Sequence, residues 1–272
     1  MPDPVEFRSD LYRGTASYYD RYRLSYPTEL ISDLVARASL DGAGRLLDVA
    51  CGTGQLAFAL QPFVAEVVGI DQEQDMVDFA SAKASSRGLP KMQWVTRRAE
   101  EFSAAKPFDL ATIGNAFHRL PRSVVAERAR QWLAPGGHLA LVESSAAHSG
   151  PAPWQRALDD CAKGWAERVG ENDRVPEGWD TDIARRPHAA VLAAAGFNVV
   201  GRYDFVDLHD WTLDELVGFL YSTSFFPRAA LGARAVEFEA DLAQRLFAVE
   251  PSGVFREEIT AGYDLAIAPA AR

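Results

Sequence analysis

The first half of the chain alternates short apolar runs with longer stretches of helical periodicity. Runs such as Leu46-Leu47 followed by Val49 show no apolar/polar alternation, which is typical of parallel strands covered on both faces. They predict strands over 45–49, 66–71, 92–96, 108–113 and 138–143. Helical segments separate most of these strands. The pattern therefore predicts an α/β fold whose parallel sheet is doubly wound.

This alternation of strands and helices ends after residue 145. Trp154, Leu158, Cys161 and Trp165 recur at helical spacing, and residues 171–182 are polar and rich in Gly and Pro. We interpret the segment as an inserted amphipathic helix followed by a long loop. The tryptophans could simply bury the insertion against the sheet, or the insertion could cover an apolar substrate pocket. The aromatic run 219–226 could line the same pocket.

The rest of the chain predicts a short helix over 187–195 and strands over 198–208 and 257–268. Between these two strands, Thr212 and Glu215 form a capping box ahead of a helical apolar stripe. We therefore expect four regions: an N-terminal helical arm or lid (1–40), a cofactor-binding core (41–145), a helical insertion (146–185), and the remainder of the core with inserted helices at 212–249 (186–272).

Composition limits the classes of partner. The 272 residues carry a formal net charge of −10, which argues against nucleic acid as a partner because its backbone is bound by Lys and Arg. Two cysteines provide no disulfide framework, and we find neither a membrane-spanning stretch nor a signal peptide, so we expect a cytoplasmic protein. The histidines are too dispersed for a metal site.

The most informative stretch is the strand and turn from Leu46 to Ala57. Gly52 and Gly54 allow a sharp turn close to a ligand, and the following helix directs free N–H groups at the loop. Gly52-x-Gly54-x-x-Ala57 superficially matches a dinucleotide motif. However, Asp48 stands at the tip of the strand, where it would repel a pyrophosphate. The ammonium and sulfonium of S-adenosylmethionine would suit that carboxylate.

A second carboxylate, Asp71, ends the next predicted strand. It can accept both hydrogen bonds of a ribose diol, a charge-assisted pair worth about 2–3 kcal/mol. Gln72 and Met76 would then lie near an adenine ring.

Together these motifs resemble the class I S-adenosylmethionine-dependent methyltransferases over roughly residues 40–145. The resemblance implies a Rossmann-like, seven-stranded, mostly parallel sheet with an antiparallel last strand. It also implies that the glycine loop, with Ala50, Gly52, Thr53 and Gly54, passes under the methionine part of the cofactor. Ala99 and Glu100 would hold the adenine edge.

The segment 114–118 is similar to the Ala-Phe-His-Trp signature of a subset that methylates small molecules, with Asn115 near the cofactor and Arg119 in place of tryptophan. Residues 18–27 also resemble the arm of that subset. There, a tyrosine and an arginine hold the carboxylate of the cofactor, and Tyr19 and Arg23 match them. Packing of an amphipathic helix is the alternative role for this arm, and the two roles are compatible.

Methyl transfer needs alignment of acceptor, methyl and sulfur, and a hydroxyl acceptor also needs a base. His118 follows the fourth strand, where the acceptor should approach. Glu143 and His148 follow the fifth strand and should face the same crevice. We expect His188 and His209 at the surface.

The sequence therefore predicts a methyltransferase that acts on a small aromatic or apolar metabolite, as a monomer or homodimer. One alternative is an enzyme of the same fold that uses the bound cofactor only as a scaffold, for example for cyclisation. A nicotinamide-dependent oxidoreductase is less favoured because of Asp48 and the loop spacing.

Overall fold

The protein is built on one seven-stranded sheet in the order β3-β2-β1-β4-β5-β7-β6. The computed structural model describes residues 7–8, 10–171, 173–174, 176 and 179–270. The strands are β1 (Arg45–Val49), β2 (Glu66–Asp71), β3 (Met92–Thr96), β4 (Phe108–Gly114), β5 (Leu133–Ser144), β6 (Asn198–Trp211) and β7 (Phe255–Ile267). The first five pair in parallel, and β7 runs antiparallel to both β5 and β6. The predicted mostly parallel sheet with an antiparallel last strand is confirmed.

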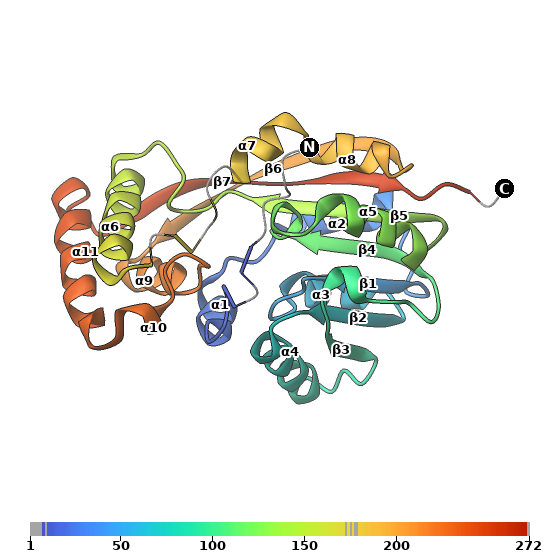
Figure 1. Ribbon diagram of the computed structural model, residues 1–272, viewed down its shortest axis with the longest axis horizontal. Helices are drawn as coiled ribbons and strands as arrows, with labels where there is room; N and C mark the ends of the chain where they lie inside the picture. Colours follow the sequence, from blue (N-terminus) through green and yellow to red (C-terminus); the bar gives the residue numbers. More distant parts are fainter. Residues whose placement is uncertain (1–6, 9, 172, 175, 177–178, 271–272) are drawn as a thin grey trace.

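Helices cover both faces of this sheet (Figure 1). The helices of the sheet layer are α2 (Thr28–Arg37), α3 (Gln55–Leu60), α4 (Gln74–Ser86), α5 (Arg122–Trp132) and α8 (His188–Ala194). Because side chains alternate along a strand, Leu46 packs with α2 and α3 on one face, while Leu47 packs with α5 and α8 on the other. An apolar layer therefore packs against each face of the sheet, as the unbroken apolar runs predict.

Strands β6 and β7 extend past the rest of the sheet. In the ladder, β5 pairs with β7 only as far as Ala261, while β6 continues to pair with residues 255–260. The prediction that the sixth strand ends at Leu208 was wrong, because pairing with β7 continues to Trp211. β5 also begins earlier than predicted, at Leu133. The extension carries both strands toward the helices at one end of the molecule (Figure 1).

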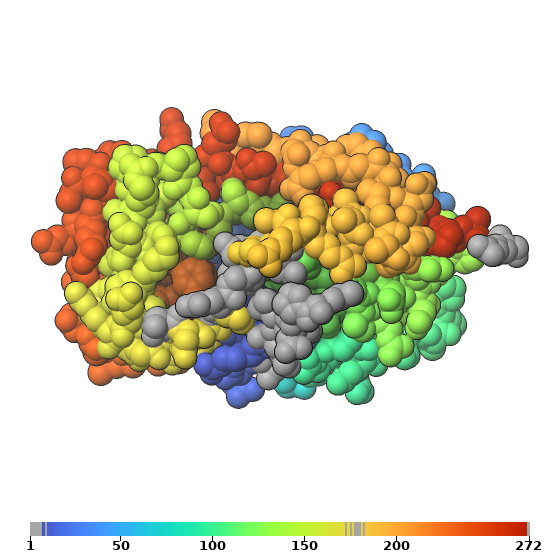
Figure 2. Space-filling model, turned by 45° about the horizontal axis from the view of Figure 1, so that its top comes forward, coloured from blue at the N-terminus to red at the C-terminus, as the bar shows by residue number. Residues whose placement is uncertain are grey.

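Those helices form a second layer that we call the helical cap: α6 (Pro153–Val169), α9 (Leu213–Tyr221), α10 (Arg228–Leu231) and α11 (Ala235–Val249). The predicted stripe on α6 is buried, and Trp165 donates a hydrogen bond to Asp241 of α11 at 2.8 Å. Figure 2 shows α6 and α11 at the same end of the molecule. The predicted loop over 171–182 falls partly outside the described residues, and α7 (Trp179–Arg185) occupies its end, so that prediction was too long.

The N-terminal arm carries α1 (Ala16–Tyr22), which contacts both α9 and α4. Asp20 forms an ion pair with Lys83 of α4, and Tyr22 donates to Asp214 of α9 at 3.2 Å. The arm therefore spans the opening between the sheet layer and the cap. Within the described residues, no helix is both long and apolar enough to cross a membrane.

Gly218 offers a test of how the arm docks. A Cβ at this position would overlap the ring of Tyr22, whereas a Cβ at Gly164 of α6 would meet nothing within 4 Å. We expect Gly218→Ala to displace the arm and speed proteolytic cleavage before residue 28. Gly164→Ala should stabilise the protein by about 0.5–1 kcal/mol, because alanine loses less backbone entropy in a helix.

Limited proteolysis and urea unfolding of both variants measure these effects. Equal cleavage rates in the arm of the two variants would contradict the docking described here.

Candidate functional site

The glycine loop folds into a tight turn directly after β1. Ala50, Gly52 and Gly54 all have positive φ angles, of 52°, 53° and 83°. This conformation strains Ala50 and suits the two glycines. A Cβ at Gly54 would overlap the indole of Trp94, and the ring of Tyr19 lies over Gly52. The loop therefore needs glycine both for its backbone angles and for close packing.

Asp48 lies under this loop and is 1% exposed. Its carboxylate accepts hydrogen bonds from Thr112 Oγ1 at 2.9 Å and from the Ala57 N–H at 3.1 Å. Burial outweighs these bonds and raises the pKa of Asp48 to about 7. Asp48 thus helps to order the start of α3, and a nearby cation would favour its charged form.

Asp71 joins the tip of β2 to the same loop. Its Oδ2 accepts the Gly52 N–H at 2.8 Å, and its Oδ1 accepts the Glu73 N–H at 3.0 Å. Burial raises the pKa of Asp71, while these two N–H donors act in the opposite direction. A carboxylate has about four acceptor positions. Asp71 can therefore still accept a pair of hydroxyl groups.

Next to the loop lies a small cavity, which we call the loop cavity. It is lined by Tyr19, Tyr26, Asp48, Ala50, Cys51, Gln55, Leu56 and Gly114. None of these residues is Lys or Arg, and Asp48 places a carboxyl group among them. In addition, Thr53 Oγ1 is buried and has no hydrogen-bond partner among the described residues.

The arm places Tyr19 in the lining of this cavity and of a neighbouring one. Arg23 lies in the lining of the neighbouring cavity. The guanidinium carbon of Arg23 lies 5.0 Å from the centre of the Tyr19 ring and 4.8 Å from that of Phe219. Arg23 donates to Ser222 Oγ at 2.8 Å, and it forms no ion pair with a described residue. Burial raises the pKa of Tyr19 to about 12. The predicted shared face of Tyr19 and Arg23 is confirmed.

A larger cavity, which we call the acceptor cavity, adjoins the loop cavity. The two share Tyr19, Tyr26 and Gln55. Asn115 forms part of its wall with a positive φ of 50°, and its amide donates to Tyr26 Oη at 3.2 Å. The Ser144 N–H donates to Asn115 Oδ1 at 2.9 Å. Asn115 therefore ties the ends of β4 and β5 to the arm.

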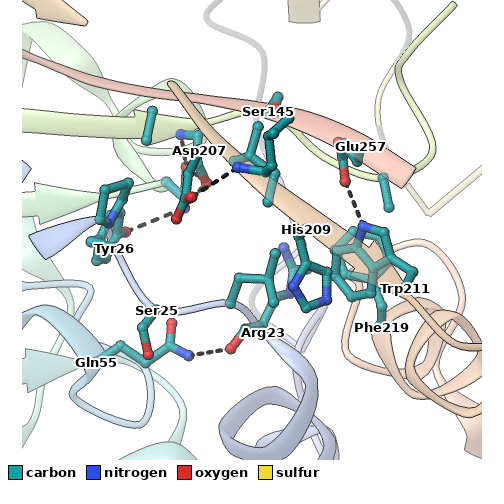
Figure 3. A pocket seen from close by; sticks show the side chains of 18 of the residues that line it. Arg23, Ser25, Tyr26, Gln55, Ser145, Asp207, His209, Trp211, Phe219 and Glu257 are labelled. Atoms are coloured by element: carbon teal, nitrogen blue, oxygen red, sulfur yellow. Dashed lines mark hydrogen bonds between the residues drawn. The ribbon is translucent and has the colours of Figure 1, made fainter. Parts of the chain in front are cut away.

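The far wall of the acceptor cavity comes from the β6–β7 extension (Figure 3). Asp207, His209 and Trp211 alternate along β6, and His209 is the cross-strand neighbour of Glu257. Trp211 Nε1 donates to Glu257 Oε2 at 2.7 Å. Sequence reasoning missed this wall, because it ended the strand at Leu208. The alternation of polar and aromatic residues beyond that point was the available signal.

The predicted catalytic residues lie outside the lining of the acceptor cavity. His118 Nε2 accepts from Arg119 at 3.1 Å, and burial lowers the pKa of His118 to about 3. Glu143 bonds to His188 at 2.9 Å and faces α8, so it does not share a crevice with His148. His148 packs between Phe219 and Phe225, and burial lowers its pKa to about 4.

Two surface predictions were also tested. His188 is 6% exposed and bonded to Glu143, so its expected surface position was wrong. His209 is half-buried in the cavity wall, and its Nε2 is fully buried.

Of the residues predicted to lie near adenine, Met76 is buried on α4 and Gln72 is exposed. Ala99 is buried in a short 3-10 helix, where Glu100 pairs with Arg98 at 2.7 Å. These four residues lie around the tips of β2 and β3, and none of them lines the loop cavity or the acceptor cavity. Their contacts with adenine stay predictions.

Comparison with known proteins identifies the family. A family model described as a methyltransferase domain matches residues 46–137. Over 177 residues the chain is 33% identical to demethylmenaquinone methyltransferase from Thermus thermophilus, covering 60% of this chain and 77% of that protein. It is 27% identical over 172 residues to trans-aconitate 2-methyltransferase from Azoarcus sp., covering 61% and 64%.

Solved structures share the fold. An S-adenosylmethionine-dependent methyltransferase from Thiobacillus denitrificans, in complex with S-adenosylhomocysteine, superposes with a TM-score of 0.52 at 17% identity, covering 95% of this chain and 97% of that one. The [4+2]-cyclase SpnF gives 0.55 at 17% identity, covering 99% and 100%. The match spans only about a third of the length of some curated relatives. It covers 36% of a probable S-adenosylmethionine-dependent methyltransferase from Saccharomyces cerevisiae and 30% of the putative methyltransferase YqeM from Bacillus subtilis.

The protein belongs to the class I S-adenosylmethionine-dependent methyltransferases. Its cofactor is S-adenosylmethionine, and two carboxyl groups near the glycine loop are compatible with it: Asp48 lines the loop cavity, and Asp71, bonded to the Gly52 N–H, can still accept hydroxyl groups. Membership of this family sets the nicotinamide alternative aside.

The raised pKa of Asp48 predicts a pH dependence of stability. Its pKa is 3.8 ordinarily and about 7 in the folded protein. Between these values the native state binds more protons than the unfolded state, so stability falls as pH rises from about 4 to 7. At about 1.4 kcal/mol per pKa unit, the loss is a few kcal/mol.

Urea unfolding of Asp48→Asn and of the natural protein at pH 4.5 and 7 measures this loss. The variant should lose less stability over the interval. Glu73, whose pKa burial also raises to about 7, contributes equally to both proteins and cancels. Parallel pH profiles would contradict the assignment.

Proposed function

We propose that the protein transfers the methyl group of S-adenosylmethionine to a small aromatic molecule bound in the acceptor cavity. The observation that carries this proposal is the adjacency of the two cavities, which share Tyr19, Tyr26 and Gln55. A cofactor on the glycine loop would direct its methyl group toward the neighbouring chamber. Trp211 and Phe219 in the lining offer flat apolar surfaces to an aromatic acceptor.

Each part of the cofactor has a matching group in this proposal. Tyr19 and Arg23 would hold its carboxylate, Asp48 would attract its ammonium through the loop, and Asp71 would accept its ribose hydroxyls. Gln72, Met76, Ala99 and Glu100 would surround the adenine. When bound, S-adenosylmethionine supplies an electrophilic methyl group. This chain's residues align the acceptor and exclude water, effects that can supply roughly 7–11 kcal/mol.

The curated relatives support a small acceptor, since demethylmenaquinone and trans-aconitate methyltransferases are named for small molecules. The net charge of −10 argues against nucleic acid. A reaction that uses the cofactor only as a scaffold is supported by likeness of fold to the cyclase SpnF alone.

Asp71 provides the test of the cofactor site. By calorimetry, Asp71→Ala should weaken S-adenosylmethionine binding tenfold or more, which is about 1.4 kcal/mol, because the ribose hydroxyls lose a charged acceptor. Asp71→Asn keeps an oxygen for the Gly52 N–H and should lose less. Glu66→Gln, at the exposed start of the same strand, should bind like the natural protein.

Affinity unchanged in Asp71→Ala would show that the ribose lies elsewhere, and no binding by the natural protein at millimolar cofactor would overturn the proposal. Mass spectrometry of a converted acceptor separates methyl transfer, which adds one CH₂, from a scaffolded reaction, which does not.

A further inference from the structure

His209 is a histidine in the wall of the acceptor cavity that makes no hydrogen bond with any described residue. Its Nε2 is buried, and burying a ring nitrogen without a partner costs free energy. The residue as a whole is only half-buried and lines the cavity, so a ligand there can reach the exposed part of the ring. By contrast, His118 Nε2 already accepts from Arg119, and His188 already bonds to Glu143.

Neighbouring residues hold the His209 ring in place. Its centre lies 4.5 Å from the centre of the Trp211 ring at an interplanar angle of 81°, an edge-to-face contact. The Trp211 indole is in turn fixed by its 2.7 Å hydrogen bond to Glu257. Glu257 is 5% exposed and lies directly across the ladder from His209. A carboxylate at this position would stabilise a positive charge that forms on the imidazole.

Further charged and titratable groups surround this histidine on the elements packed against it. They are Arg23, Tyr19 and Tyr26 of the arm, Asp207 in the same cavity wall, and Asp210, which pairs with Arg256. Asp210 is committed to that ion pair, and Asp207 is exposed. Glu257 is therefore the buried carboxylate nearest to His209 along the ladder.

We propose that His209 is the general base of this enzyme, and that the acceptor is an aromatic hydroxyl compound whose ring packs against Trp211 and Phe219. The inference rests on the proposed function. It names the acceptor atom as oxygen, since an amine or thiol acceptor depends less on a base.

The reaction balances as follows. The hydroxyl oxygen of the acceptor forms a bond to the methyl carbon, and the pair of electrons of the carbon–sulfur bond goes to sulfur. The hydroxyl proton passes to the imidazole of His209. One positive charge, initially on the sulfonium, is found afterwards on the imidazolium, opposite Glu257. Water later removes the proton.

The test uses 4-nitrophenol, whose phenolate absorbs visible light. With S-adenosylhomocysteine bound, the natural protein should shift bound 4-nitrophenol to phenolate at a pH where the free probe is mostly protonated. His209→Gln should reduce that phenolate signal about tenfold, while its affinity for S-adenosylhomocysteine and its melting temperature stay unchanged. His138→Gln, within β5 and outside the cavity lining, is the matched control and should behave like the natural protein.

A second measurement follows the histidine rings directly. The chain has five histidines, so their ring resonances can be resolved by NMR in protein labelled at histidine. Adding 4-nitrophenol should move one set of resonances, assigned to His209 with the Gln variant or by proximity to Trp211, to the protonated position. If 4-nitrophenol is methylated, His209→Gln should lower kcat about 100-fold or more with little change in KM.

The inference is overturned if 4-nitrophenol does not bind, if it binds without a phenolate signal, if His209→Gln retains that signal, or if the His209 resonances do not move. Binding of S-adenosylhomocysteine distinguishes a failure of the role of His209 from a failure of the proposed function. If it binds and the phenolate does not form, only the role of His209 fails. If it does not bind, the proposed function fails as well.

Discussion

The antiparallel pairing of β6 and β7 beyond the end of β5 is the constraint on which the outer half of the molecule depends. From Phe255 to Thr260, β7 pairs with β6 alone. The helical cap lies at the far end of this extension, because α9, α10 and α11 connect its two strands. The same extension presents His209 and Glu257 to the acceptor cavity. Breaking this pairing would therefore separate the cap from the sheet and open the cavity wall.

Sequence reasoning succeeded where local chemistry dictates the structure. The tight turn at Gly52 and Gly54 needs positive φ angles, so glycine spacing alone located the loop. The unbroken apolar runs of β1 and β2 reflect burial on both faces, which only a covered parallel sheet provides. The capping box at Thr212 was likewise visible, because its two hydrogen bonds join residues three positions apart. Family resemblance added the antiparallel direction of β7.

Sequence reasoning failed where residues distant in the chain determine the environment. His209 and His188 both looked like surface residues. The cross-strand position of Glu257 and the contact of His188 with Glu143 arise from pairings that span roughly 45 residues or more. β6 was predicted too short because the alternation over its last three residues is too brief a local signal, and only pairing with β7 holds these residues in the ladder. Tertiary pairing overrides such weak local signals.

The sharing of Tyr19, Tyr26 and Gln55 between the two cavities has a kinetic consequence. One short segment, anchored to α4 through Asp20 and to α9 through Tyr22, forms part of the boundary of both chambers. A molecule seated on the glycine loop would order this segment and thereby complete the wall of the second chamber. The cofactor should then enter first and its spent form leave last, so the enzyme would follow a compulsory order of binding. The arm that separates the chambers would thus also set the sequence in which they fill.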